Sequence, residues 1–438
     1  MDKQSVVIDN GTSFTKIGYG GNIEPDLILP TVIADFDRKD TSISPKKKDE
    51  YIEYNYYIGE YAISKTKESK NHKLIYPIQN GLIENWDLME KFWTSSIFEY
   101  LKCDPEEHNF VLTENLMNTP LNREKMAEIF FETFGVPGLY IGVQPVMAFL
   151  GYQKYSEDCD FDFYSYEAKK EAKKEALRSL TGIVIDSGES DFHVVPFIDG
   201  FVVDAYIKHI PISGKKITEL MQEMIKERGE KICTADLKYA VMEIKEKYGY
   251  LARDLVEELA KYDKKQNVGG KLTQNSKFRK FEGIGKISNK PYSINLGYEL
   301  FFVPEAIIYP GNVDINYKYE LDEIIDYTIQ RCPKEYRRKL YSNIIFSGKS
   351  TSFKNLDRKL ELYIDRRINE RLKNNYSIKN NIYVSVTNNC SNNNIVWLGA
   401  SYISSNDSFK EVLHTREEYE EKGPSCCRFS HIRFIDLK

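Results

Sequence analysis

The sequence predicts an α/β protein of two related lobes, and three observations support this fold class. The phrase VVIDNG at residues 6–11 returns as IVIDSG at residues 183–188, so an apolar strand that ends in Asp and turns on Gly occurs near the start of each half. With 438 residues, the chain is longer than one hydrophobic core ordinarily organises. Short apolar runs also alternate with helical patterns along its length, which is typical of α/β architectures.

The first half is expected to open with a β-hairpin, formed by the apolar run at 5–8, the turn at 9–13 and the run at 14–19. The elements expected after it are, in order, an amphipathic helix over 85–101, a buried strand over 110–114, a helix over 123–134 that Gly135 and Pro137 end, and a strand ending at 143–144.

The second half opens with the repeated strand at 183–188 and is expected to follow the same alternation. The elements expected after it are strands within 201–212, helices over 217–228, 320–331 and 352–373, a strand with a Gly turn at 343–348, a strand over 382–386, and a helix from Trp397 that leads into the tail.

Three polar segments interrupt this pattern, at 36–70, 154–180 and 263–292. We expect the first to form a small exposed subdomain and the third to be a peripheral loop region. The segment 154–180 is expected to be an insertion between the lobes. Its helix, from about Glu167 to Leu177, carries charges on every side, so we expect it to be exposed and dispensable for the fold. A binding role and a plain surface helix remain equal alternatives for it.

The composition excludes several classes of function. The formal net charge is −5 and basic patches are short and interrupted by acids, so no nucleic-acid partner is expected. No apolar run approaches a membrane span, and the first four residues lead straight into a strand, so neither a membrane helix nor a signal peptide is expected. The seven cysteines form no Cys-x-x-Cys pair, and only Cys426 and Cys427 are close together. An odd count without a secretory signal favours reduced thiols in the cytosol or nucleus.

The two Asp-x-Gly hairpins are suited to holding phosphates. A tight turn on Gly presents backbone N–H groups to an anion, and an Asp at the strand end can hold a hydrated Mg²⁺ beside it. Either hairpin alone is a weak signal, because the same pattern marks any tight turn. The pair, together with a third Gly turn at Gly348, predicts a clamp for a nucleoside triphosphate between two lobes.

The chain resembles the actin superfamily over nearly its whole length, and within it the actin-related protein 3 branch. The phrases that carry the resemblance to the superfamily are 76–78 with Gly81, 86–90, 112–114, 122–124, 131–134, 244–247, 347–351 and 397–399. Those typical of the branch are VPGLYI at 136–141, IKHIPI at 207–212, and His414-Thr415 with YEEKGPSC at 419–426. The resemblance implies a ribonuclease H-like duplicated fold of two lobes with a central nucleotide cleft.

It also implies a site for ATP or ADP with Mg²⁺. Asp9 and Asp186 would hold the metal through water, and Gln144 would orient the attacking water with His193 assisting. The implied nucleotide-binding positions are Gly11, Thr12, Ser13 and Lys16 in the first turn, Gly188, Glu189 and Ser190 in the second, Gly348 and Lys349 in the third, and Lys245, Glu246 and Phe353 on the adenosine side. The alternative is that the two aspartates only stabilise turns and that Gln144 is a satisfied core amide.

Near the phosphates the sequence departs from the family pattern. Ser13 stands in place of a usual Gly, Glu189-Ser190 in place of Asp-Gly, Phe192 in place of a common Thr, and Lys349 in place of a second Gly. We expect these side chains to hinder close approach of the backbone and to cause strain wherever φ is positive. Glu189 would also bring an acid toward the phosphates, and Lys349 would offset its charge.

The function that this resemblance implies is that of an ATP-binding actin-related protein 3-like subunit. It would pair with actin-related protein 2 and further subunits in one complex, bind actin and nucleate branched filaments in the cytoplasmic cytoskeleton, with the nucleus as a second location. Any ATPase activity would be slow and regulatory. Lobe one is expected at 1–150 and 395–438, with 31–75 as its outer subdomain, and lobe two at 151–394, with 213–300 as its outer subdomain.

Two alternatives belong to other classes. The first is an actin-fold scaffold subunit with a degenerate nucleotide site, in another (nuclear or spindle) complex, which the substituted phosphate turns would favour. The second is a sugar-kinase-like phosphotransferase, for which the tail at 414–428 would have no purpose.

Overall fold

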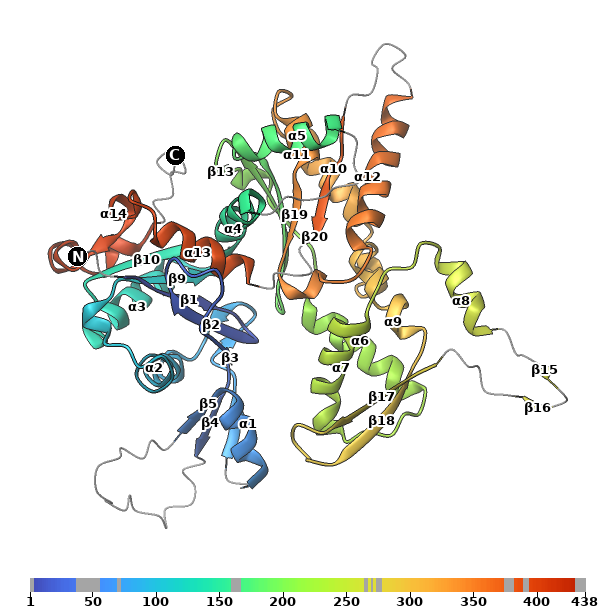
Figure 1. Cartoon of the computed structure of the whole chain (residues 1–438), viewed down its shortest axis with the longest axis horizontal. Helices are drawn as coiled ribbons and strands as arrows, with labels where there is room; N and C mark the ends of the chain where they lie inside the picture. The colour runs from blue at the N-terminus through green and yellow to red at the C-terminus, as the bar shows by residue number, and fades with distance from the viewer. Residues whose placement is uncertain are drawn as a thin grey trace. The chain divides into compact units, whose positions relative to one another are not determined.

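The chain divides into two compact units of α/β structure (Figure 1). The computed structural model describes residues 4–36, 56–68, 72–158, 167–263, 267–268, 271–272, 278–373, 382–388 and 394–429. Unit 1 comprises Met1–Met147, Lys286–Asn289 and Val396–Ile432, and unit 2 comprises Ala148–Gly285, Lys290–Ile395 and Arg433–Lys438. Within the described residues, none of the helices has both the length and the apolar character needed to cross a membrane.

Unit 1 is built on a six-stranded sheet in the order β21-β10-β9-β1-β2-β3. Its strands are β1 (Val6–Asn10), β2 (Phe14–Tyr19), β3 (Leu27–Pro30), β9 (Phe110–Glu114), β10 (Gly138–Val143) and β21 (His414–Thr415). Strands β1 and β2 form the expected hairpin, while β1, β9 and β10 run parallel. Every residue of β1 and β9 is buried, because a central parallel strand is covered on both faces.

Unit 2 repeats this arrangement. Its sheet has the order β13-β12-β11-β19-β20, with β14 (Lys208–His209) added beside β12. The strands are β11 (Gly182–Ser187), β12 (Phe192–Ile198), β13 (Phe201–Val202), β19 (Ile344–Ser347) and β20 (Val386–Asn388). Again a hairpin, β11 with β12, is followed outward by two parallel strands, β19 and β20. Both units thus contain one hairpin, one third antiparallel strand and two parallel strands in the same spatial order, which confirms the predicted duplicated fold.

The expected helices of unit 1 are present. Helix α2 (Trp86–Thr94) begins where the Asn85 side chain accepts a hydrogen bond from the Leu88 N–H at 3.0 Å, and it continues as a π-helix over Ser95–Leu101. Its buried face, with Phe92 and Trp93, covers the sheet core. The remaining elements of unit 1 are β4 (Ile33–Phe36), β5 (Tyr56–Ile58), α1 (Gly59–Glu68), β6 (His72–Ile75), β7 (Ile78–Gln79), β8 (Leu82–Ile83), α3 (Pro120–Glu128) with a π-helix (Ile129–Thr133), α13 (Ile395–Ser404), α14 (Phe409–Val412), α15 (Arg416–Lys422), and 3-10 helices at Pro105–Glu107 and Gly423–Cys427.

Helices of unit 2 pack around its sheet to form a second, separate core. They are α5 (Glu167–Arg178), α6 (Gly214–Glu227), α7 (Thr234–Tyr248), α8 (Leu255–Asp263), α9 (Glu299–Phe302), α10 (Leu321–Arg331), α11 (Arg337–Ser342) and α12 (Leu356–Leu372), with 3-10 helices at Asp204–Tyr206, Pro304–Ile307, Pro310–Asn312 and Lys349–Thr351. Helix α4 (Gln144–Asp158) starts in unit 1. Two short strands, β15 (Asn267–Val268) and β16 (Lys271–Leu272), pair with each other.

The expectation of a loop region over 263–292 is wrong for its described second part. Strands β17 (Arg279–Ile284) and β18 (Pro291–Leu296) form a six-pair antiparallel hairpin. Phe281, Ile294 and Leu296 are buried in the core of unit 2, whereas most of their strand neighbours are exposed. The sequence of both strands alternates between buried and exposed side chains. The Lys and Gly residues within and beside the strands made this period of two hard to recognise. Residues 264–266, 269–270 and 273–277 lie outside the described residues.

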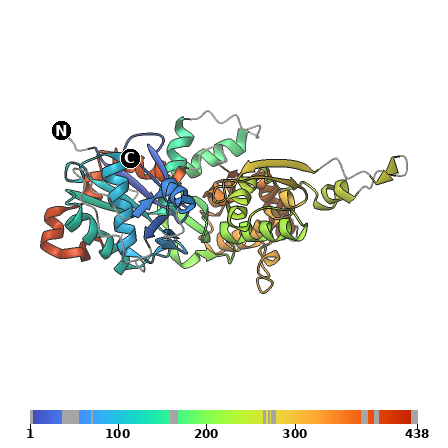
Figure 2. The same cartoon turned by 90° about the horizontal axis from the view of Figure 1, so that it is seen from below.

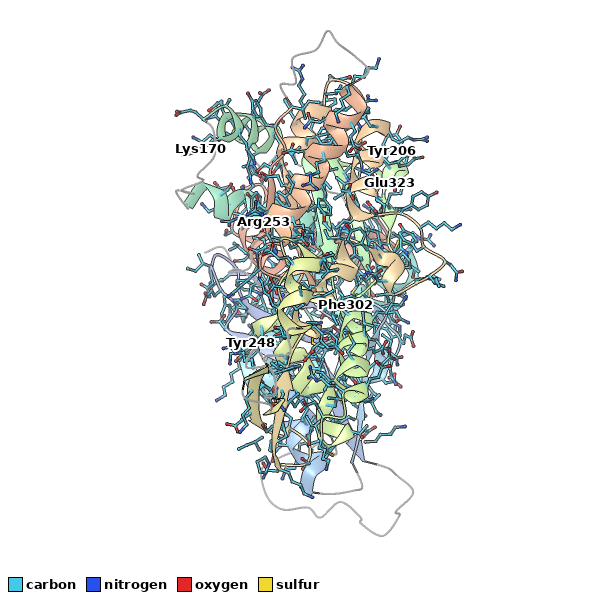
Figure 3. The ribbon with its side chains drawn as sticks, turned by 90° about the vertical axis from the view of Figure 1, so that its right-hand side faces the viewer. Lys170, Tyr206, Tyr248, Arg253, Phe302 and Glu323 are labelled. Atoms are coloured by element: carbon cyan, nitrogen blue, oxygen red, sulfur yellow. The ribbon has the colours of Figure 1, made fainter. Side chains whose placement is uncertain are left out.

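The expectation that 154–180 is exposed is also wrong for one side of α5, while its dispensability for the fold stays a prediction. Lys173 and Ala176 are buried, and the Ala172 carbonyl accepts a hydrogen bond from the Ser342 hydroxyl of α11 at 3.1 Å. Lys169 forms an ion pair with Glu361 of α12. Lys170 is on the exposed side of the helix (Figure 3), while Figure 2 shows α5, in green, beside the end of α4. One buried stripe is enough to dock a helix that is charged elsewhere. The residues 159–166 lie outside the described part.

Lys173 makes the stability of unit 2 depend on pH. Its ammonium donates to the Thr387 hydroxyl and lies 5.3 Å from the Tyr152 ring centre, and burial lowers the pKa of Lys173 to about 7 although Glu361 opposes this. Because the unfolded chain keeps the ordinary, higher pKa, it binds more protons above pH 7, so stability should rise from about pH 7 upward.

Lys173→Met is expected to remove this pH dependence. At pH 6 it should stabilise the protein by about 1–4 kcal/mol, since a buried charge is replaced by an apolar side chain of similar length. Urea unfolding from pH 6 to 9 measures both effects. Lys170→Met, on the exposed side of the same helix, should leave the profile of the wild type unchanged. A Lys173→Met profile that still rises with pH would contradict the assignment.

Candidate functional site

The first half-site is centred on Asp9 at the end of β1. This carboxylate is 3% exposed and accepts hydrogen bonds from three side chains. Lys16 Nζ lies 2.9 Å from Oδ2, and Thr113 Oγ1 and Gln144 Nε2 lie 2.6 and 3.3 Å from Oδ1. The hairpin register places Lys16 opposite Asp9, and the parallel neighbour β9 supplies Thr113. Asp9 is therefore a fixed carboxylate with one cation beside it, at the carboxyl end of the central strands.

The turn after Asp9 requires its glycine. A Cβ at Gly11 would lie 2.4 Å from the Phe14 carbonyl oxygen, closer than any side chain tolerates. The carbonyls of Gly11 and Ser13 accept hydrogen bonds from the hydroxyl and the N–H of Thr31, at 2.8 and 3.0 Å. Because the C=O and the next N–H of a planar trans peptide point in opposite directions, the N–H groups of Thr12 and Phe14 point away from Thr31.

Gln144 is only partly used by the protein. Its amide nitrogen donates to Asp9 and to the Asn10 carbonyl oxygen, 3.1 Å away. Its carbonyl oxygen makes no hydrogen bond with the described residues, and the side chain is half-buried. The alternative of a fully satisfied core amide therefore does not hold. The remaining acceptor can receive a hydrogen bond from a water molecule.

The second half-site is centred on Asp186 in β11. The sheet registers place His193 of β12 and Ser347 of β19 directly beside Asp186, so the three side chains share one face. His193 Nε2 and Ser347 Oγ are buried and have no hydrogen-bond partner among the described residues. Buried polar atoms are nearly always satisfied by protein, water or ligand. Two such atoms beside a carboxylate fit a hydrated cation or an ordered water on this face.

His193 is neutral at physiological pH. Burial, together with the ring of His209 at 5.2 Å, lowers the pKa of His193 to about 4. A neutral imidazole carries one N–H and one lone pair, so it can exchange hydrogen bonds with water without adding charge.

The first residues of helix α6 fix the turn after Asp186 by hydrogen bonds. The N–H groups of Gly214 and Lys215 donate to the carbonyls of Gly188 and Glu189 at 3.1 and 3.0 Å, and the Ser350 hydroxyl donates to Gly188 at 2.9 Å. By the same peptide geometry the N–H of Glu189 points away from α6.

The third turn fits against the second. Gly348 has a φ of +90°, and a Cβ there would lie 2.0 Å from the Ser187 carbonyl oxygen. Only glycine suits this position.

The residues expected on the adenosine side come together in unit 2. Lys245 of α7 is buried, and its ammonium donates to the Gly214 carbonyl and the Thr218 hydroxyl at 3.1 and 2.9 Å. Burial lowers the pKa of Lys245, although Glu189 and Glu246 act against this. Gly249, one helical turn after Lys245, lies against the Phe353 ring. A Cβ on Gly249 would be only 2.5 Å from a carbon of that ring, so the glycine allows this contact.

The expectation of backbone strain at the substituted turns needs correction. Within the described residues, positive φ occurs at six positions that are not glycine, and none of them is Ser13, Glu189, Ser190 or Lys349. The predicted backbone strain is therefore absent at these four residues. Glu189 extends toward the start of α6, where burial raises its pKa and Lys245 lowers it. Lys349 forms an ion pair with Glu246 at 2.6 Å. The positions that require glycine, Gly11 and Gly348, still have it.

The sequence pattern missed several residues that build these half-sites. Thr113 and Ser347 lie in phrases that carry the family resemblance but were not expected in the site, and each stands at or next to the end of a strand that is parallel to an Asp-bearing strand. The carboxyl ends of parallel strands meet at one edge of a sheet, which is the signal that could have identified them. Gly214 and Thr218 accept hydrogen bonds from Lys245 and lie in the first turns of α6. Ser213, as a helix N-cap, is the sequence signal that places the start of this helix.

Known proteins match the chain over nearly its full length. The family model described as Actin matches residues 1–430. Actin-related protein 3 of Acanthamoeba castellanii and that of Dictyostelium discoideum are each 38% identical to the chain, covering 98% of it and 97% of the relative. Actin-related protein 3 of Caenorhabditis elegans is 39% identical, covering 97% of both. With its duplicated sheets and two Asp-Gly hairpins, the chain belongs to the actin family.

Proposed function

We propose that the chain binds ATP or ADP with Mg²⁺, as membership of the actin family implies. The observation that carries this proposal is the repeated hairpin: in each unit a buried strand has an Asp next to its end and is followed by a turn that contains Gly. Asp9 and Asp186 would hold the cation through water, which suits Mg²⁺ because it keeps much of its hydration shell. When bound, the cation supplies charge neutralisation for the phosphates.

Other residues of the chain would contact the phosphates, the adenosine and the attacking water. Lys16 contributes a positive charge whose position Asp9 fixes, and Thr12, Ser13 and Ser190 line the turns. The adenosine side would be formed by Lys245, Glu246 and Phe353, with Lys349 paired to Glu246. Gln144 would accept a hydrogen bond from the attacking water through its carbonyl oxygen, and neutral His193 would hold a second hydrogen bond to water. Without a charged general base, hydrolysis would be slow, and the nucleotide would act mainly as a conformational ligand.

We further propose that the chain is an actin-related protein 3-like subunit of a complex with actin-related protein 2, that it binds actin, and that it nucleates branched filaments in the cytoplasmic cytoskeleton. Support comes from the relatives named actin-related protein 3, which match the chain over 97% of their own length, and from the tail at 414–428, which resembles that branch. The scaffold alternative is not favoured, because the substituted turns keep an unstrained backbone. The sugar-kinase alternative is not favoured by any relative named here.

The partner proposal predicts a stoichiometric complex. The chain, tagged at its N-terminus and purified from its native source, should copurify with one second actin-like protein and with a fixed set of other subunits, identified by mass spectrometry. The tag alone is the control. The purified complex should accelerate actin polymerisation and give branched filaments by fluorescence microscopy. A monodisperse monomer with no actin-like partner would contradict the proposal.

A further inference from the structure

Three buried side chains that could ligate a metal converge beneath the tail of unit 1. His414 lies in β21, and Cys426 and Cys427 end the 3-10 helix Gly423–Cys427. Their ligand atoms lie within 4.8 Å of one another, and all three residues are buried. Across the described residues, no other group of three or more His, Cys, Asp and Glu meets this criterion. The nucleotide proposal uses none of these residues.

The spacing of the sulfurs suits one tetrahedral ion. Cys426 Sγ and Cys427 Sγ lie 3.7 Å apart. Two thiolates bound to one Zn²⁺ at about 2.3 Å and at the tetrahedral angle are separated by about 3.8 Å. The pair is thus close to the separation that a shared zinc ion requires, and it is far too long for a disulfide bond.

His414 has the outer contact that metal-bound histidines have. Its Nδ1 lies 3.0 Å from Glu418 Oε2, and Lys422 Nζ lies 3.0 Å from the other oxygen of the same carboxylate. A carboxylate on Nδ1 holds the proton there and leaves the lone pair on Nε2, which is the tautomer that binds a metal.

The surroundings hold these ligands on a rigid frame. Thr415 caps α15 through the Glu418 N–H at 3.2 Å, and the Tyr419 ring stacks on Phe131 with centres 4.5 Å apart. The Tyr419 hydroxyl donates to Glu132 at 2.6 Å, and Arg428 forms an ion pair with Glu124 at 3.2 Å. The cysteines are therefore positioned against α3 and its π-helix without any contribution from a metal, as a preformed site requires.

We propose that His414, Cys426 and Cys427 bind one Zn²⁺, with a water as fourth ligand and Glu418 as the residue that positions His414. Binding releases the two thiol protons to solvent, with no change in oxidation state. The ion would join His414 of β21 to cysteines twelve and thirteen residues further along, in the 3-10 helix, and so attach the tail to the sheet of unit 1.

The test uses the full-length reduced chain. Zinc should be present at one equivalent per chain by elemental mass spectrometry. Replacement of zinc by Co²⁺ should give thiolate-to-cobalt absorption in the near ultraviolet and d–d bands of tetrahedral intensity in the visible. Cys426→Ser, Cys427→Ser and His414→Gln should each abolish that spectrum and weaken zinc binding, measured by competition with a chromogenic chelator, by more than about 100-fold. Glu418→Gln should weaken it by about 10- to 100-fold, as is typical of outer-shell partners.

Cys103→Ser is the matched control, because Cys103 is also a buried free cysteine of unit 1. Its zinc affinity and cobalt spectrum should equal those of the wild type. The cobalt spectrum of the wild type decides the proposal even if a variant fails to fold. Absence of thiolate-to-cobalt absorption with equimolar Co²⁺, a Cys426–Cys427 disulfide in protein purified under reducing conditions, or zinc content unaffected by all three ligand variants would each overturn it.

Discussion

Asp9→Asn and Asp186→Asn are each expected to weaken Mg²⁺-dependent ATP binding by about 10- to 100-fold, the loss typical of a removed partner in the outer shell of a metal. Asparagine keeps the size of the side chain and one acceptor for Thr113 and Gln144, but it removes the charge that attracts a hydrated cation. Asp9→Asn also leaves Lys16 without its ion-pair partner. Isothermal titration calorimetry with ATP, with and without Mg²⁺, measures the effect for each variant.

Two control variants separate this effect from others. Asp204→Asn removes an exposed carboxylate of unit 2 and should leave ATP affinity unchanged. Replacing Ser13, Ser190 and Lys349 together by glycine should change the affinity by less than about threefold, since no positive φ is present to be relieved. If either aspartate variant binds Mg–ATP like the wild type, that unit does not contribute to the nucleotide site. A large gain from the glycine variant would show that the three side chains do obstruct it.

Lys359→Met is expected to destabilise unit 2 by about 3–5 kcal/mol, because it leaves a buried carboxylate without its partner. Lys359 Nζ donates to both oxygens of Glu305, at 2.6 and 2.7 Å, and to the Ala252 carbonyl at 3.0 Å. Both residues of the pair are buried, and they link α12 to the 3-10 helix Pro304–Ile307. The thermal midpoint should fall by on the order of 10 °C in calorimetry.

The loss should grow with pH. Burial raises the pKa of Glu305, and Lys359 opposes that rise. Without Lys359 the pKa in the folded state is higher still, so the folded state binds the extra proton and its stability falls as pH rises above the ordinary carboxyl value of 4.5.

Two further variants test this explanation. Lys359→Met combined with Glu305→Gln should recover a large part of the stability, because no charge then remains buried. Lys247→Met, which removes an exposed ion pair with Glu243, should cost less than about 1 kcal/mol. A Lys359→Met variant as stable as the wild type at pH 8 would show that the pair contributes little.

The sequence by itself determined the features that short segments encode. The hairpins at Val6–Tyr19 and Gly182–Ile198 were predictable because their apolar strands and Gly turn lie within a few residues of each other. Helix α2 was predictable from its apolar spacing and the Asn85 cap. The repeat of the hairpin then predicted the duplicated fold, which the two sheets confirm.

The tertiary structure alone decided the features that depend on which distant segments meet. The donors around Asp9 come from three elements, and Thr113 is 104 residues away in sequence. Whether Ser13 or Lys349 strains the backbone depends on φ, which their surroundings set. Helix α5 appears fully solvated in sequence because its buried side consists of Ala176 and a lysine, and only α11 and α12 show that this side is covered. The convergence of His414 with Cys426 and Cys427 likewise needs the packing of α15 on unit 1, because spacing along a chain fixes contacts only within one local element.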